Sequence, residues 1–285
     1  MRGSTGVRQH ENTGSHMIPN VLSIAGSDPS GGAGIQADIK AISANGAFAM
    51  AVITALTAQN TQGVTGVHLV PPDFVQSQID AVFADIRVDA VKIGMIANAE
   101  IAAAVAQSLQ EHGGIPVVLD PVMIAKGGAD LLQPDAMMTL RDALLPLATL
   151  LTPNLPEAAH LLGTRTATTR AEMVAQGRAL CALGPQAVLM KGGHLNGPDS
   201  PDCLVTPHGT TWFEAERTPT ANTHGTGCTL SSAVAAGLAH GLAPARAVAV
   251  AKSYVAKAIA NADALSVGSG HGPTHHFAAL YANRK

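Results

Sequence analysis

Short apolar runs alternate with longer amphipathic segments along most of this sequence. Residues 21–25, 49–53 and 90–93 are compact runs of small and branched apolar side chains, which are typical of buried strands. Between them lie segments of helical length whose apolar positions recur three or four residues apart. Strands that alternate with helices predict a mostly parallel sheet with helices on both faces, so we expect an α/β protein of three layers, α/β/α.

The remaining elements follow from the same pattern and from turn and capping signals. Thr169 and Glu172 have the spacing of a capping box at a helix start. The pattern changes between 202 and 216, where two runs around Pro207-His208-Gly209 predict a small β-hairpin at the sheet edge. Further strands are expected at 116–120, 150–152 and 187–190, and helices at 34–45, 72–83, 98–112, from Pro156, at 173–183, 227–240 and 243–261.

The N-terminal segment differs from the rest of the chain. Its first 17 residues are polar and aperiodic, and Gly14-Ser15-His16-Met17 resembles a cloning scar. We therefore expect residues 1–17 to be an expression-tag remnant or a disordered leader. No linker, repeat or low-complexity block interrupts the pattern that follows, so residues 18–285 are expected to form a single domain.

The composition narrows the classes of function. Of the 285 residues, 47% are hydrophobic and 13% are charged, and the formal net charge is −3. Lys and Arg are scattered singly, which argues against the basic surface that nucleic-acid binding requires. The three cysteines are unclustered, which favours a reducing compartment over a disulfide framework or a zinc site. No apolar run has the length of a membrane span, so we expect a cytoplasmic protein without nucleic-acid or membrane partners.

A glycine-rich turn, residues 25–34, joins the first strand to the first helix. It contains Gly32-x-Gly34-x-x-Ala37, which formally matches a dinucleotide-binding fingerprint. The extra turn Asp28-Pro29-Ser30-Gly31, and the lack of an acidic residue after the next strand, argue against dinucleotide binding. The alternative is a turn that binds no ligand. The sequence also lacks a P-loop motif, so any use of ATP must employ another phosphate-binding device.

Residues 222–229, Asn-Thr-His-Gly-Thr-Gly-Cys-Thr, run directly into a helix of small residues. Glycines at a helix start allow several free N–H groups to converge on one anion, and the helix dipole favours negative charge there. The segment therefore predicts an anion hole made by Gly225, Thr226, Gly227 and Cys228. The same field is expected to lower the pKa of the Cys228 thiol and to favour its thiolate. The alternative is a tightly packed loop in which Cys228 is inert.

Polar side chains also follow several of the other expected strands. The carboxyl ends of parallel strands meet at one edge of a sheet, so these residues should line a common site. Asp120 and Glu157 offer oxygen ligands for Mg²⁺, and Lys191 can meet phosphate charge. Asp38 and Gln59 offer hydrogen bonds to a polar ring, with a solvated surface position as the alternative.

Other candidates carry weaker signals. Cys181 is expected in the core, and Cys203 in the predicted hairpin. His275 and His276 are expected to be a surface pair rather than a metal site, because no matching third ligand is present. Whether residues 125–128 close over the site is left open by the sequence.

Taken in order, these motifs closely resemble the hydroxymethylpyrimidine/phosphomethylpyrimidine kinases of the ribokinase-like superfamily. The resemblance extends from about Asn20 to Phe277. It implies a ribokinase-like fold, a homodimer and two successive transfers from ATP. The first makes the monophosphate of 4-amino-5-hydroxymethyl-2-methylpyrimidine, and the second makes the diphosphate used in thiamine biosynthesis. The motifs that carry it are AGSDPSGGAGIQAD (25–38), TALTAQNT (54–61), KIGM (92–95), TPNLPEA (152–158), MKGGH (190–194) and HGTGCT (224–229).

The resemblance also implies roles for single residues. Positions that hold the pyrimidine in the family correspond to Gly26, Asp38, Gln59 and Met95. Thr57 is a polar residue where an apolar contact with the ring is expected, which puts fine selectivity in doubt. ATP is expected to contact Asn154, Lys191, Thr223 and His224, and Mg²⁺ to be held by Asp120 and Glu157, partly through water.

Cys228 occupies the position where most ribokinase-like sugar kinases carry an Asp that takes the proton from the acceptor hydroxyl. The cysteine resembles a replacement that either deprotonates the hydroxyl or orients it. The nearest alternative function is a pyridoxal or pyridoxine kinase of the same superfamily, whose substrate is also a ring with a hydroxymethyl group. A cysteine hydrolase based on Cys228 and a non-catalytic pyrimidine-binding protein are the alternatives of other classes.

Overall fold

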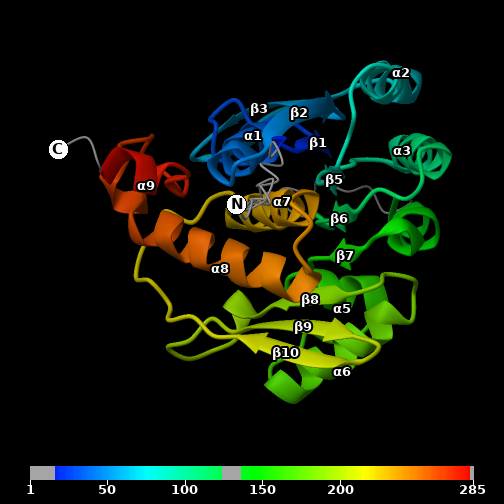
Figure 1. Cartoon of the computed structure of the whole chain (residues 1–285). Coiled ribbons are helices and arrows are strands. Elements are labelled where there is room, and N and C mark those ends of the chain that lie inside the picture. The colour runs from blue at the N-terminus through cyan, green and yellow to red at the C-terminus, as the bar shows by residue number, and fades with distance from the viewer. Residues whose placement is uncertain (1–16, 124–135, 283–285) are drawn as a thin grey trace, which may run out of the picture.

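Within the described part of the chain, eight strands form one mostly parallel sheet (Figure 1). The computed structural model describes residues 17–123 and 136–282. The strand order is β10-β9-β8-β7-β6-β5-β1-β2, and only β9 and β10 run antiparallel to their neighbours. The strands are β1 (Asn20–Ala25), β2 (Phe48–Ile53), β5 (Ala90–Ile93), β6 (Val117–Leu119), β7 (Leu150–Leu151), β8 (Val188–Lys191), β9 (Asp202–Thr206) and β10 (Gly209–Phe213).

Helices cover both faces of this sheet, and the apolar core is split into one cluster on each side. The result is the three-layer α/β/α arrangement that the sequence predicts. One face carries α1 (Gly34–Ala44), α7 (Thr226–Ala239) and α8 (Pro244–Ala260), with α7 between the other two in Figure 1. The other face carries α2 (Pro72–Phe83), α3 (Ala99–Glu111), α5 (Leu155–Leu162) and α6 (Arg170–Cys181). Two further α-helices of the described residues are only four residues long: α4 (Ala136–Thr139) and α9 (Ala278–Tyr281).

Alternate residues of the central strands point to opposite faces of the sheet. In β5, Val91 and Ile93 belong to the core cluster that includes α3, whereas Ala90 belongs to the cluster that includes α7 and α8. Lys92 therefore points toward α1 and α7. The strand period thus places a lysine in the interior, on the same face as Ser23 of β1.

Several predicted local features are confirmed. β9 and β10 form the expected hairpin at the sheet edge, and Cys203 lies in it. Thr169 and Glu172 form the predicted capping box at the start of α6. Cys181 ends α6 and packs against the core. Most of the expected tag remnant (residues 1–17) and the candidate loop at 125–128 lie outside the described residues.

A second hairpin was not predicted. It consists of β3 (Ala55–Asn60) and β4 (Gly63–Leu69) and stands apart from the main sheet. Its residues are largely exposed, so they lack the clear alternation of apolar and polar positions by which a half-buried strand is recognised. The Ser27 N–H donates a hydrogen bond to the Ala55 carbonyl oxygen at 2.8 Å, so the hairpin starts beside the glycine-rich loop.

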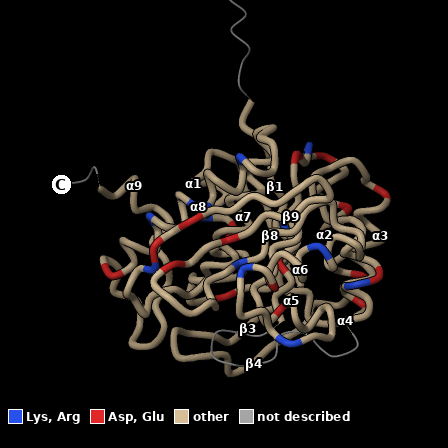
Figure 2. The backbone as a smooth tube through the Cα atoms, turned by 90° about the horizontal axis from the view of Figure 1, so that it is seen from below, with Lys and Arg blue, Asp and Glu red and all other residues tan. Residues whose placement is uncertain are grey.

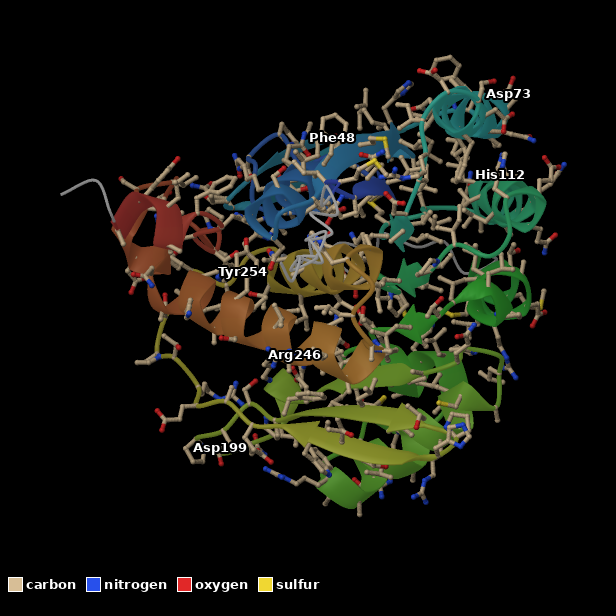
Figure 3. All side chains as sticks on the ribbon, in the orientation of Figure 1. Phe48, Asp73, His112, Asp199, Arg246 and Tyr254 are labelled. Carbon is tan, nitrogen blue, oxygen red and sulfur yellow. The ribbon has the colours of Figure 1, made fainter. Side chains whose placement is uncertain are left out.

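The prediction of a surface pair at His275 and His276 is wrong. Both residues are buried, with relative exposures of 7% and 5%. His276 Nε2 lies 3.0 Å from Thr229 Oγ1 on α7. Tyr254, labelled on α8 in Figure 3, donates a hydrogen bond from its hydroxyl to the His276 carbonyl oxygen at 2.9 Å. The segment around His276 thus packs against α7 and α8, a long-range contact that the local sequence pattern does not reveal.

Among the described residues, none of the helices combines the length and the apolar character that crossing a bilayer would require.

Candidate functional site

The first turn of α7 packs directly against the glycine-rich loop that follows β1. Gly225 precedes α7 with φ of 75°, a left-handed conformation that favours glycine. A Cβ atom on Gly225 would lie 1.7 Å from the Gly32 carbonyl oxygen. Glycine is therefore required by both the backbone angle and the close approach, and the two predicted loops lie together as one unit.

The predicted anion hole has free donors. In the part of the chain that the structure describes, the main-chain N–H groups of Gly227 and Cys228 have no protein acceptor, as expected for the first turn of a helix. They lie at the positive end of the α7 dipole. Thr229 N–H is the first of this turn to close a helical bond, to the Gly225 carbonyl at 2.8 Å. This arrangement can stabilise a group that carries or develops negative charge.

The Cys228 thiol is half-buried beneath this turn, and its pKa differs from the predicted direction. Burial raises the pKa of the Cys228 thiol to about 11; the Lys92 ammonium opposes this effect, and the Asp38 and Asp120 carboxylates add to it. The sequence predicted a lowered pKa and a thiolate. The structure instead favours a neutral thiol at physiological pH, because the loss of hydration outweighs the positive field.

Asp28 organises the glycine-rich loop. Its Oδ1 accepts hydrogen bonds from the Ser30 N–H and hydroxyl, and its Oδ2 accepts one from the Ala33 N–H at 2.8 Å. His224 Nε2 lies 2.7 Å from the same Oδ2. Burial by itself would raise the pKa of Asp28, but hydrogen bonds from His224 and Ser30 lower it to about 2. Asp28 therefore stays ionised and joins the loop to the residue that precedes the anion hole.

His224 was predicted to contact ATP, but the structure gives its ring another position. The side chain is buried between Asp28 and Gln59, with Gln59 Nε2 at 3.4 Å from His224 Nε2. Its main chain is held by the C-terminal segment, since His224 N–H donates to the Gly272 carbonyl at 3.0 Å. Thr223, the adjacent predicted residue, lies in the loop that enters α7. His224 therefore connects the ring side of the site to the anion hole.

A small apolar cluster lies beside the glycine-rich loop; we call Gly26, Met95 and the inward residues of β3 the ring region. A Cβ atom on Gly26 would lie 2.9 Å from Met95 Sδ, so any residue other than glycine would have to displace the Met95 side chain. Met95 packs with Ala55 and Ala97 in a separate apolar cluster. Gln59, which the sequence places in a loop, lies on β3.

Thr57 shares the inward face of β3 with Gln59. Its hydroxyl donates a hydrogen bond to the Ser27 carbonyl oxygen at 2.9 Å and lies 3.2 Å from Gln59 Oε1. The hydroxyl is thus occupied by the protein, which leaves the Thr57 methyl group available for apolar contact. Thr57 is consequently a less polar neighbour for a ring than the sequence indicates.

Asp38 does not lie where the sequence predicted. Its side chain is fully buried, and its carboxylate accepts hydrogen bonds from the Lys92 ammonium at 2.9 and 2.8 Å, and from the hydroxyls of Ser23 and Ser232. A direct contact with a substrate ring would require these partners to give way. The structure therefore places Asp38 behind the site rather than in it.

A second group of charges lies on the other side of the anion hole. Lys191 Nζ is 2.8 Å from Asp120 Oδ1 and 3.9 Å from Glu157 Oε2. A Cβ atom on Gly227 would lie 3.2 Å from Lys191 Nζ and 3.4 Å from Asp120 Oδ2, so this group adjoins the first turn of α7. Burial raises the pKa of Glu157 to about 7; Lys191 lowers it in part and Asp120 raises it.

Asn154 holds this side of the site through a capping box. Its side-chain oxygen accepts a hydrogen bond from the Glu157 N–H at 2.8 Å, and Glu157 Oε2 accepts one from the Asn154 N–H at 2.7 Å. The box fixes Glu157 at the start of α5. In this structure Asn154 thus caps α5 and holds Glu157 in position.

The carboxylates suit Mg²⁺ only as part of a shared site. Mg²⁺ prefers oxygen ligands, keeps several waters and is often bound by one or two carboxylates together with substrate phosphates. Among residues 17–123 and 136–282, no group of three His, Cys, Asp or Glu side chains is placed to enclose a metal ion. Asp120 and Glu157 fit an ion held partly by water and phosphate, rather than a closed protein cage.

The family of the chain can be stated once this geometry is compared with known proteins. The family model described as phosphomethylpyrimidine kinase matches residues 28–275. The chain belongs to the phosphomethylpyrimidine kinase family. The match includes the anion-hole segment, the Asp120–Lys191 group and all but the first residues of the glycine-rich loop.

Individual relatives agree with this assignment. The hydroxymethylpyrimidine/phosphomethylpyrimidine kinase of Salmonella typhimurium is 56% identical over 262 residues, which covers 92% of this chain and 98% of the relative. The crystal structure of phosphomethylpyrimidine kinase from Clostridium difficile has a TM-score of 0.76 and 44% identity, covering 85% of this chain and 99% of that one. An ADP complex of Bacillus subtilis pyridoxal kinase has a TM-score of 0.85 and 34% identity, covering 93% and 100%.

The sequence does not single out two residues that the structure shows in and behind the site. It indicates Asp28 only as part of a turn, although an Asp two residues before a Ser often accepts its backbone N–H. It indicates Lys92 only as part of the KIGM motif, although a single lysine in an otherwise apolar strand is itself unusual. Both residues become informative when the structure shows their partners, His224 and Asp38.

We expect Gly225→Ala to damage the anion hole. A Cβ atom there must displace the Gly32 carbonyl and would shift the α7 N–H groups, so kcat should fall about 10²-fold. Steady-state kinetics would measure this. Gly241→Ala is the matched control, because Gly241 also has positive φ, of 78°, but a Cβ atom there meets nothing. Equal and small losses in both variants would contradict the requirement for close packing.

Cys228 should react slowly with iodoacetamide near neutral pH. Only the thiolate is nucleophilic, so with a pKa of about 11 the rate should rise about tenfold per pH unit from pH 7 to 10. Peptide-resolved mass spectrometry would follow the reaction, with Cys228→Ser as the control for assignment. A rate that levels off below pH 9 would show an activated thiolate instead.

Proposed function

We propose that this chain transfers phosphate from ATP to the hydroxymethyl group of 4-amino-5-hydroxymethyl-2-methylpyrimidine, and then to the resulting monophosphate, in thiamine biosynthesis. The observation that carries the proposal is the position of the anion hole. It adjoins both the glycine-rich loop beside the ring region and a buried charged cluster suited to phosphate. Family membership and the names of the closely similar relatives support the same reaction.

The ring would lie against Gly26 and Met95, with Gln59 hydrogen-bonded to its polar edge. This pose directs the hydroxymethyl group toward Cys228 at the start of α7. Its neutral thiol would orient the hydroxyl rather than remove the proton in advance. The N–H groups of Gly227 and Cys228 would stabilise the charge on the transferred phosphoryl group, which is the main demand of a loose transition state.

ATP would bring its phosphates to the opposite side of the anion hole, near Lys191. The Lys191 ammonium keeps its charge: burial disfavours it, but Asp120 and Glu157 raise the pKa of this group. Asp120 and Glu157 would hold Mg²⁺ partly through water, and the ion would neutralise phosphate charge when bound. Solved neighbours include a Staphylococcus aureus pyridoxal kinase with AMP-PCP, which supports the nucleotide assignment.

The surface charge supports a small-molecule substrate. Figure 2 shows Lys and Arg interspersed with Asp and Glu along the described backbone, without a stripe of one sign. Such a surface offers little attraction to a polyanion, so we propose a cytoplasmic enzyme that acts without nucleic-acid or membrane partners.

A purified enzyme should release ADP with the pyrimidine alcohol, and again with its monophosphate. Phosphorus NMR of the products would identify both steps. Cys228→Ala should lower kcat about 10²-fold because the hydroxyl loses its positioning partner. Cys181→Ala, which changes a cysteine on α6, is the control.

Each alternative predicts another result in the same assay. Turnover of pyridoxal without turnover of the pyrimidine would overturn the substrate assignment. ATP-independent turnover would favour a hydrolase, and pyrimidine binding without any ADP release would favour a non-catalytic protein.

We also propose that the chain forms a homodimer that covers the β3–β4 hairpin. An isolated two-stranded hairpin is marginally stable unless it packs against something. Leu56 and Val67 of this hairpin are 47% and 46% exposed. β2 is the open edge of the main sheet, and its Phe48 is also exposed and lies at the outer margin of the molecule in Figure 3. A second copy would bury these apolar groups.

Light scattering after size-exclusion chromatography should give twice the mass of one chain. Leu56→Glu should shift the protein toward the monomer, because a charge would be buried at the interface. Met138→Glu is the control, since Met138 is 69% exposed on α4, which packs against α3. A monomeric wild-type protein would contradict the proposal.

A further inference from the structure

Lys92 is a charged side chain in the apolar interior. It has no exposed surface and is among the largest fully buried side chains of the described residues. Its Nζ donates to both carboxylate oxygens of Asp38, at 2.9 and 2.8 Å, and Asp38 is equally buried. Removing two charges from water costs a free energy similar in size to the attraction gained between them. Replacing such a pair with apolar side chains of similar volume therefore often leaves the stability of a protein unchanged. The stability of the fold therefore does not by itself account for this pair.

The Asp38 carboxylate is a meeting point of four elements. Asp38 lies on α1 and Lys92 on β5. Ser23 of β1 donates a hydrogen bond to Asp38 Oδ2 at 2.6 Å, and Ser232 of α7 donates one to Oδ1 at 2.8 Å. Ser232 lies four residues after Cys228, so the two share one face of α7. The bond from Ser232 therefore fixes the rotation of the helix turn that presents Cys228.

The ammonium end of the pair points toward the site. A Cβ atom on Gly94, just beyond the carboxyl end of β5, would lie 2.6 Å from Lys92 Nζ. The charged groups that act on Cys228 are Lys92, Asp38 and Asp120, and the effect of Lys92 in lowering the pKa of the thiol exceeds the opposing effect of either carboxylate. The Lys92 charge thus lies close enough to the first turn of α7 to act on Cys228.

We propose that Asp38 and Lys92 are a pair of positioning residues for phosphoryl transfer. Asp38 holds the first turns of α7 through Ser232, and Lys92 places a fixed positive charge behind the anion hole. A dipole oriented before the reaction stabilises charge that develops in the transition state without needing to reorganise. Neither side chain has exposed surface, so the pair is not placed to contact a substrate. Its loss should therefore lower kcat while leaving the KM for the acceptor alcohol nearly unchanged.

The double variant Asp38→Asn/Lys92→Met tests the charge. It removes both charges together, so neither is left unpaired in the interior. We expect a melting temperature and circular dichroism close to those of the wild type, kcat lowered at least about 10-fold and KM for the alcohol within about threefold. A folded double variant whose kcat stays within twofold of the wild type would overturn the proposal.

A pair of serine variants tests the positioning and does not depend on the double variant folding. Ser23→Ala and Ser232→Ala each remove one buried hydrogen bond to the same carboxylate, but only Ser232 lies on α7. Both variants should lose similar stability in urea. Ser232→Ala alone should lower kcat, by about three- to tenfold. Equal kcat values in the two variants would contradict a role in positioning α7.

The inference rests on the proposed phosphoryl transfer but not on the identity of the alcohol. All kcat values are ratios to the wild type with the best acceptor it uses. If the wild type phosphorylates pyridoxal instead of the pyrimidine, the substrate proposal fails and this test remains valid. If the wild type transfers no phosphate to any alcohol, the proposed function fails. The inference itself fails when the wild type is active and either the double variant keeps its kcat within twofold or the two serine variants have equal kcat.

Discussion

The close approach of Gly225 to the carbonyl of Gly32 is the contact on which the geometry of the site depends. It brings the start of α7 against the loop that follows β1, although the two segments are almost 200 residues apart in the chain. The pairing of Asp28 with His224 reinforces the same junction. Because the two loops are in contact, the anion hole and the ring region keep a defined distance. A hydroxyl held against the ring region can then be aligned with a phosphoryl group in the hole.

Charge in and directly behind this site occurs in close pairs of opposite sign. Asp38 is paired with Lys92 and Asp120 with Lys191, each within 3 Å. Such pairs hold their charges in place and present them in fixed directions, which is the property that electrostatic stabilisation requires. The Cys228 thiol, by contrast, remains neutral because burial disfavours its thiolate.

The ring side and the phosphate side are built differently. The ring region is formed by Gly26, Met95 and the inward residues of β3, which come from three separate segments. The phosphate side is formed by residues at or just after the carboxyl ends of strands and by a capped helix start. Pyridoxal kinases share this fold with the chain, so the fold alone does not select the acceptor alcohol. Selection has to come from the few side chains of the ring region.

The sequence by itself determined the layers of the fold, the edge hairpin, the capping box at Thr169 and the glycine-rich helix start at which we predict the anion hole. These features depend on local backbone preferences and on the period of apolar residues, which neighbouring positions encode. Only the tertiary structure decided that Asp38 lies behind the site, that His276 is buried against α7 and that the Cys228 thiol stays protonated. Each of these depends on desolvation and on side chains that meet from distant segments. A local sequence pattern contains no information on desolvation or on these long-range contacts, because the groups meet only when α7 packs on the sheet.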